Sequence, residues 1–227
     1  MLELDGIPVS GGSRIGRALL YEETIAAAPS TLASHASMLT SLVVPHHGAS
    51  IARGTGLASA HLTLAEVLRE HGYATASWNG GGQLDELYQL DQGFELYQSA
   101  LRRTRPSSTP SVDRLDQAVT KGLEWIDGLA FGRPVFLFLH SYEGHSPYVP
   151  DPELRALFGR TETRLTDAVL GEDLERFRSG EWTVEPGDLQ HVIACYDAEI
   201  RSADQAFGRL VDSLKERELL DSTVVVL

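Results

Sequence analysis

Cysteine is almost absent from this sequence, which has one cysteine among 227 residues. A lone cysteine excludes an intramolecular disulfide and every zinc site that is built on paired cysteines. Because Cys195 lies in an apolar helical pattern, we interpret it as a small core side chain. Long apolar runs are missing as well. None approaches the ~18 residues that a membrane-spanning helix needs, so no membrane segment is predicted in this chain.

Positive charge is also scarce, with 19 Lys and Arg residues against 32 Asp and Glu residues and a formal net charge of −13. Such a surface repels phosphate backbones, so nucleic acid is not predicted as a partner. An anionic small substrate is compatible with this charge, because a site needs only local donors or metal ions. Residues 1–30 lack the order of a secretory signal, and localisation stays unknown. A periplasmic or secreted location would need a signal upstream of residue 1.

Apolar residues recur at helical spacing in several segments, and short apolar runs follow them. This alternation predicts an α/β fold with a mostly parallel central sheet flanked by helices. The composition, 42% hydrophobic and 22% charged, indicates a single globular domain over residues 1–227. The pattern predicts a helix with a capping box at 63–72 and a strand at 73–78. A second helix is predicted from about Ser111, followed by a strand buried on both faces at 135–139. A long helix at 188–220 and a terminal strand at 223–227 come last.

A shorter helix is predicted at residues 35–44 with Ser34 as its cap, which places Thr31 just before a helix N-terminus. The free N–H groups and the dipole at such an end favour a bound sulfate or phosphate. A threonine hydroxyl attacks phosphorus or sulfur only after a base or a metal ion activates it. The plainer interpretation is a threonine in a turn, and the residues alone leave both open.

Two histidines follow the strand expected at 135–139. Ligands of open α/β sheets bind beyond the carboxyl ends of the strands, where His140 lies, with His145 in the next loop. Such a histidine donates to an anion, acts as a general acid or binds a metal, unless it only bonds to backbone or water. Glu143, between the two, has the chemistry of a base, but a loop glutamate is usually solvated, which is what we expect here. The acidic segment 150–187 is interpreted as an insertion over the site end of the sheet.

Several segments together resemble the sulfatase family of the alkaline phosphatase superfamily. The first, TLASHASMLT, resembles the nucleophile box of that family, and FLFLHSYEGHSPY resembles its strand with a histidine-containing loop. The matching segments occur in the family's order over nearly the whole chain, which is more specific than any one motif. They lie at 31–40, 47–48, 63–78, 92–97, 136–148 and 196–227.

The resemblance implies an alkaline phosphatase-like fold and hydrolysis of sulfate or phosphate esters. It makes Thr31 the nucleophile and a metal contact, and it makes His145 a catalytic contact to the transferred anionic group. It implies that His35, His140 and Asn79 bind substrate. It also implies a divalent metal (Ca, Zn or Mn) in the complete protein, and an anionic small-molecule or glycan ester as substrate.

The threonine separates two chemistries within this resemblance. Usual sulfatases oxidise Cys or Ser to formylglycine, which threonine cannot give. The Thr31-x-x-x-His35 pattern instead resembles the nucleotide pyrophosphatase/phosphodiesterases, in which a metal-bound threonine attacks phosphorus. A phosphodiesterase or phosphatase is therefore the first alternative to a sulfatase, and a non-catalytic binding or scaffold protein is the alternative of another class.

The family's metal-binding carboxylates are absent from the segments that resemble it. Its first strand, with a metal-binding aspartate, would lie before residue 1, and its Asp-His pair would lie after Leu227. The resemblance therefore implies a fragment of the catalytic domain that is incomplete at both ends of the fold. We expect such a fragment to assemble no metal site and to be inactive alone.

Overall fold

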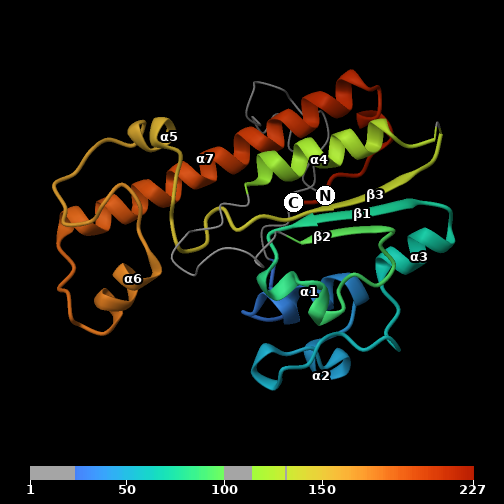
Figure 1. Ribbon diagram of the computed structural model, residues 1–227, viewed down its shortest axis with the longest axis horizontal. Coiled ribbons are helices and arrows are strands. Elements are labelled where there is room, and N and C mark those ends of the chain that lie inside the picture. Colours follow the sequence, from blue (N-terminus) through green and yellow to red (C-terminus); the bar gives the residue numbers. More distant parts are fainter. Residues whose placement is uncertain (1–23, 100–113, 131) are drawn as a thin grey trace. The chain divides into compact units, whose positions relative to one another are not determined.

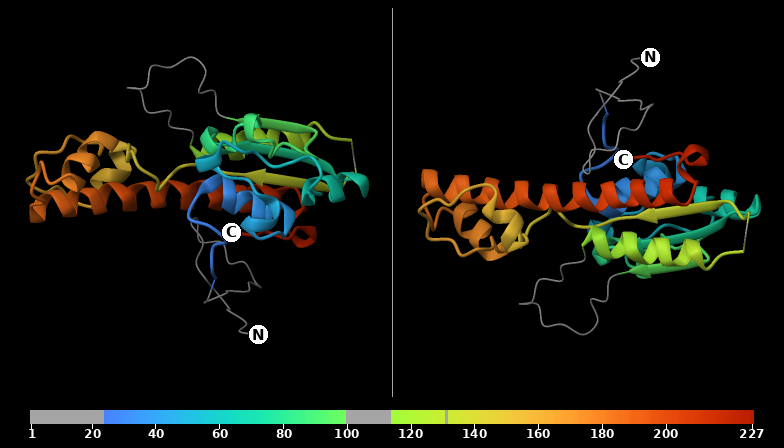
Figure 2. Two further views of the ribbon diagram at one scale, coloured as in Figure 1. Left: turned by 90° about the horizontal axis from the view of Figure 1, so that it is seen from below. Right: turned by 90° about the horizontal axis from the view of Figure 1, so that it is seen from above.

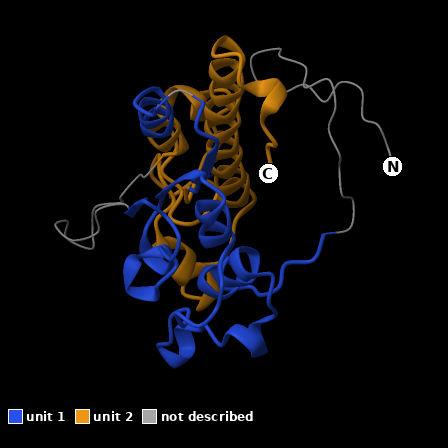
Figure 3. Cartoon of the chain, turned by 90° about the vertical axis from the view of Figure 1, so that its right-hand side faces the viewer, with its two compact units in different colours: residues 1–5, 17–104, 120–140 blue, residues 6–16, 105–119, 141–227 orange. Residues whose placement is uncertain are grey.

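The computed structural model describes residues 24–99, 114–130 and 132–227 (Figure 1). By their contacts these residues form two compact units, which Figure 3 shows in two colours. Of the described residues, the first unit contains 24–99, 120–130 and 132–140, and the second contains 114–119 and 141–227. The single domain expected over the whole chain stays a prediction.

Helices and strands follow the predicted order, with shifted ends. The capping box is confirmed, because the Glu66 N–H donates to Thr63 Oγ1 (3.1 Å) and the Thr63 N–H donates to Glu66 Oε2 (2.8 Å). The start expected near Ser111 lies outside the described residues. The elements are α1 (Thr31–Thr40), α2 (Val44–His47), α3 (Leu64–Glu70), β1 (Ala74–Asn79), β2 (Leu96–Ser99), α4 (Leu115–Asp127), β3 (Val135–Leu139), α5 (Pro152–Ala156), α6 (Gly171–Arg178) and α7 (Pro186–Glu216).

A three-stranded sheet forms the centre of the first unit, and Figure 2 shows it from two further directions. The strand order is β2-β1-β3, and both pairings are parallel. All residues of β1 are buried, because a strand lies along each of its edges. The expected α/β class with a parallel sheet is confirmed. The expectation that β3 is buried on both faces is wrong: its residues are only half-buried, since β3 is an edge strand of the described sheet.

Helices cover both faces of this sheet. Successive side chains of a strand point to opposite faces, so even and odd positions of β3 meet different neighbours. The even-numbered Phe136 and Phe138 pack against the buried cluster that includes residues of α1. The odd-numbered Leu137 and Leu139 lie against Gly122 of α4, where an added Cβ would be 3.0 Å from the Leu137 side chain. The expected flanking helices are therefore confirmed.

The turn before β2 packs tightly against the start of α3. Gly93 has a φ of +89°, and a Cβ placed on it would lie 2.1 Å from the backbone nitrogen of Glu66 and 2.5 Å from the carbonyl carbon of Ala65. The Gly93 carbonyl also accepts a hydrogen bond from Thr75 Oγ1 in β1 (2.8 Å). Only glycine fits this position, because both its backbone conformation and its surroundings exclude a side chain.

The long helix α7 runs through the second unit, and α5 and α6 lie beside its N-terminal half in both views of Figure 2. Cys195 is fully buried, as expected. Four large apolar residues of this amphipathic helix are 41–52% exposed: Leu189, Ile193, Tyr196 and Ile200. The buried stripe includes polar residues with partners, which a hydrophobicity pattern does not detect: Asp188, His191, Glu199 and Ser202. Within the described ranges, no helix combines the length and the apolar character needed to cross a membrane.

The prediction of a strand at residues 223–227 is wrong. A short 3-10 turn (Leu220–Ser222) follows the end of α7, and the residues after this turn have no regular structure. Val224 is 89% exposed and Leu227 is 95% exposed. A strand is held by backbone hydrogen bonds to a neighbour, and no strand in the described parts of the chain pairs with this segment.

A directed chain of polar contacts is buried beside α5. Arg155 Nη2 lies 3.0 Å from His191 Nδ1, and a guanidinium only donates, so this nitrogen of the ring must accept. The ring proton is therefore on Nε2, which lies 3.4 Å from the sulfur of Cys195. Burial lowers the pKa of His191, and the charge of Arg155 lowers it further.

We expect His191 to make the second unit less stable in mild acid. The unfolded ring binds a proton below about pH 6.5, whereas the folded ring, with its lowered pKa, resists it. The stabilisation is therefore present above that pH and is lost as the pH falls toward the folded pKa. Urea unfolding at pH 7.5 and 5.5 should show a larger fall in midpoint for the wild type than for His191→Gln. Equal falls in the two proteins would contradict this.

Candidate functional site

Thr31 is the first residue of α1, so the helix begins four residues earlier than the sequence predicts. Ser34 is not the cap; the N-cap is Ser30, in an extended conformation, and its side chain makes no capping hydrogen bond. Thr31 consequently lies in the first helical turn rather than before the helix. The backbone N–H groups of this turn have no partner within the helix.

Gln83, which the sequence did not single out, supplies the missing cap. Its Oε1 accepts from the Leu32 N–H (3.0 Å) and from Ser30 Oγ (2.9 Å). Because a backbone N–H can only donate, the amide atom that faces it must be the oxygen. Gln83 thus ties the N-terminal turn of α1, with Thr31, to the loop after β1.

Replacing Gln83 by Met should destabilise the protein by about 1 kcal/mol, because two donors at the start of α1 lose their acceptor. Gln83→Glu keeps an acceptor and should be nearly neutral, since a negative charge at a helix N-terminus is favourable. Gln98→Met, at an exposed position of β2, is the matched control. Urea unfolding measures all three, and a Gln83→Met variant as stable as the control would contradict this role.

His35 lies one helical turn after Thr31. Its Nδ1 is 2.8 Å from the Thr31 carbonyl oxygen, which can only accept, so Nδ1 carries a proton. Burial lowers the pKa of His35, while this hydrogen bond acts in the opposite direction. The ring is therefore neutral near pH 7, and its Nε2 carries a lone pair.

His140 directly follows β3 and lies beside His35. Its backbone N–H donates to the Trp78 carbonyl of β1 (3.0 Å), which continues the pairing of the strands by one residue. The His35 and His140 rings are 5.1 Å apart in an edge-to-face arrangement. The first unit therefore brings Thr31, His35 and His140 together at the carboxyl end of β3.

Asn79 ends β1 and is 5% exposed. Its Oδ1 accepts from the Gly81 N–H (3.0 Å), and its Nδ2 donates to Ser77 Oγ (3.2 Å). These bonds use the side-chain amide within the strand end and the glycine-rich loop that follows. The contact of Asn79 with a substrate stays a prediction.

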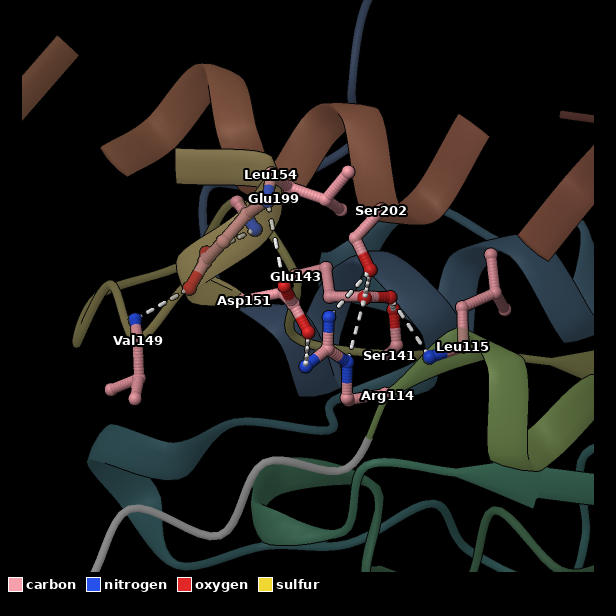
Figure 4. A network of polar contacts seen from close by, with 10 residues as sticks. Arg114, Leu115, Ser141, Glu143, Val149, Asp151, Leu154, Glu199 and Ser202 are labelled. Atoms are coloured by element: carbon pink, nitrogen blue, oxygen red, sulfur yellow. Dashed lines mark hydrogen bonds and ion pairs between the residues drawn. The ribbon is translucent and has the colours of Figure 1, made fainter. Parts of the chain in front are cut away.

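His145 belongs to the second unit, whereas Thr31, His35, His140 and Asn79 belong to the first. It is exposed, and its Nδ1 lies 2.6 Å from the Ser146 carbonyl oxygen, so this nitrogen donates. Glu143, in the same loop, is not solvated as expected. Its side chain is 6% exposed and accepts from the Leu115 N–H (2.8 Å) and from Ser202 Oγ (2.7 Å) (Figure 4).

The family model described as Sulfatase matches residues 13–227. The chain belongs to the sulfatase family. No curated protein matches it. The match covers both compact units, so the sulfatase family accounts for the order of the segments from Thr31 to the end of α7.

Solved structures share the fold of this sulfatase chain. A protein in complex with its substrate D-glucosamine-2-N,6-O-disulfate has a TM-score of 0.67 at 14% identity, with 89% of this chain and 56% of that chain covered. The phosphonate monoester hydrolase of Agrobacterium radiobacter has a TM-score of 0.58 at 18% identity, with 86% and 52% covered. A protein in complex with k-i-k-neocarrahexaose has a TM-score of 0.56 at 15% identity, with 86% and 46% covered. The chain spans about half the length of these structures.

Sulfatase membership implies a divalent metal, and the side chains near Thr31 test whether one fits. In the part of the chain that the structure describes, no group of three or more His, Cys, Asp or Glu side chains could hold an ion. His35 and His140 offer two imidazoles, whereas calcium requires several oxygen ligands and zinc at least three protein ligands. The described residues therefore do not fit a complete metal site.

Proposed function

We propose that the full-length gene product containing this chain hydrolyses sulfate or phosphate esters, with Thr31 as the nucleophile. The observation that carries the proposal is the place of Thr31. In a chain of the sulfatase family, it begins α1 beside two histidines at the carboxyl end of a parallel strand. Ligands of such sheets bind at this edge, and a helix N-terminus favours the anionic group of an ester.

The proposed reaction has two steps. In the first, Thr31 Oγ loses its proton and bonds to the phosphorus or sulfur atom, while the bond to the leaving oxygen breaks. The leaving group departs with the bonding electrons and takes up a proton. In the second step water attacks the ester of Thr31, which restores the hydroxyl and releases the acid. His145 would contact the anionic group, and His35, His140 and Asn79 would bind the substrate.

A base must remove the proton of Thr31, because an unassisted hydroxyl is a weak nucleophile at neutral pH. His35 offers the chemistry of a base, since its neutral ring holds a lone pair on Nε2, while its contact with Thr31 runs from Nδ1 to the backbone carbonyl. His35 would contact the substrate as a neutral group, because a positive charge would require a second proton on the ring, which burial disfavours.

The side chain of Thr31 favours phosphoester over sulfate chemistry within this proposal. Its hydroxyl carbon carries a methyl group, so oxidation would give a ketone rather than the aldehyde of formylglycine. The phosphodiesterase resemblance implies that the threonine hydroxyl attacks phosphorus directly, without such an oxidation. The substrate class that we propose is an anionic small-molecule or glycan ester, which is supported by a similar structure solved with D-glucosamine-2-N,6-O-disulfate as its substrate.

The test is an assay of the full-length gene product with aryl sulfate, aryl phosphate monoester and aryl phosphate diester. Each reaction is run after chelation and after reconstitution with Ca, Zn or Mn, because the family resemblance implies a divalent metal in the complete protein. Faster turnover of one ester class would identify the chemistry, and recovery with one ion would identify the metal. A folded, metal-free protein without turnover would instead support the non-catalytic binding or scaffold alternative.

A further inference from the structure

The loop at residues 141–149 has an exposed tip, and hydrogen bonds hold the backbone on both sides of this tip. Its tip carries His145, whose ring orientation depends on the hydrogen bond from Nδ1 to the Ser146 carbonyl. The direction of the imidazole is therefore set by the loop itself, through this backbone bond and an edge-to-face contact with the Tyr142 ring (5.4 Å). What holds this backbone decides where the ring points.

Glu199 of α7 holds the loop on both sides of His145. Its Oε2 accepts from the Gly144 N–H (2.8 Å) and its Oε1 accepts from the Val149 N–H (2.7 Å). Glu199 is 7% exposed, and Figure 4 shows it between the loop and the helix. One carboxylate thus joins two backbone groups that are five residues apart and enclose the histidine.

Charge pairing does not explain this buried carboxylate. Among the described residues, no salt bridge includes Glu199. Burying a carboxylate is costly unless its oxygens are hydrogen-bonded, and here both oxygens bond to the loop. The most direct physical role of the side chain is therefore to fix the backbone that it bonds.

Two further contacts support the same frame. Tyr196, nearly one turn before Glu199 on α7, packs its ring 5.8 Å from the ring of Tyr148. Upstream of His145, the two oxygens of Glu143 have different partners. Oε1 accepts from Ser202 Oγ of α7, and Oε2 accepts from the Leu115 N–H. Both ends of the loop are therefore attached to α7 within this unit.

We infer that Glu199 is a positioning residue for His145, and that it acts by holding the Gly144 and Val149 N–H groups so that the exposed imidazole keeps one direction. The importance of that direction rests on the proposed function, in which His145 contacts the transferred group. The attachment of the loop to α7 does not rest on it. Two separate measurements can therefore test the two parts.

The first measurement is hydrogen exchange in the full-length gene product. Glu199→Gln keeps the size of the side chain but sets an NH2 group against one of the two loop N–H groups. We expect exchange at Gly144 or Val149 to become roughly tenfold faster, while exchange in α7 is unchanged. Glu216→Gln, at an exposed position of the same helix, is the control. Unchanged loop exchange, or an equal rise along α7, would overturn the inference.

The second measurement separates positioning from general stability. Glu199→Gln should lower kcat/KM roughly tenfold when His145 is present, and less than about twofold in a His145→Ala background. Effects that simply add would overturn the positioning role, because Glu199 would then act without His145. If no variant hydrolyses any ester, the exchange result still decides whether Glu199 holds the loop, and the failure belongs to the proposed function.

Discussion

Thr31→Ala should lower kcat/KM for ester hydrolysis by at least roughly 10³-fold in the full-length gene product. The variant removes the only atom of this residue that can attack the ester. It should leave α1 intact, because the bond from the Leu32 N–H to Gln83 involves no atom of the Thr31 side chain. Activity and folding therefore separate, and initial rates with the preferred aryl ester together with a urea unfolding curve measure both.

Two matched variants make this result specific. Thr31→Ser keeps a hydroxyl at the start of α1 and should retain turnover. Thr40→Ala removes a hydroxyl from the last residue of the same helix, where Oγ1 donates to the Ala36 carbonyl (2.6 Å), and should change stability rather than chemistry. If Thr31→Ala keeps its activity, another group is the nucleophile.

Gly93→Ala is expected to destabilise the protein by at least about 3 kcal/mol, or to prevent folding. The added Cβ would overlap backbone atoms of Glu66 and Ala65, which belong to the first turn of α3. Backbone cannot move aside as the end of a flexible side chain can. Relief would have to break the capping box, or the bond from Thr75 Oγ1 to the Gly93 carbonyl.

Gly72→Ala is the control for this variant, because its φ of +87° is nearly that of Gly93 and nothing lies within 4 Å of its added Cβ. Strain alone should therefore cost Gly72→Ala about 1 kcal/mol. The difference between the two urea unfolding curves isolates the collision with α3. Equal losses would show that the α3 backbone yields more readily than its distances indicate.

Local patterns predicted most elements of this fold. The capping box at Thr63, the strand at β1 and the long helix α7 all depend on residues that are close in sequence, and each was found. The strand at 223–227 failed because strand formation also needs a neighbour, which a run of valines does not reveal.

The surroundings of the candidate site were not predictable in the same way. The start of α1 was misplaced because Ser34 looked like a cap, whereas the real acceptor is Gln83, 51 residues beyond Leu32. Glu199 is separated from Gly144 by 55 residues. A glutamate within an amphipathic helix gives no sign that it holds a distant loop. The sequence suggests candidates for the chemistry, but not the residues that hold them in place.

Side chains at even-numbered positions of β3 point to one face of the sheet, and this face carries both core residues and a candidate site residue. Phe136, Phe138 and His140 fall on the even side, and the ring contacts of His35 with Phe138 and His140 place that side toward α1. Adding or deleting one residue within this strand would exchange its two faces, and it would move His140 away from His35 in the same event. During evolution, substitutions here can therefore be absorbed one at a time, whereas a change of length would cost the fold and the site together.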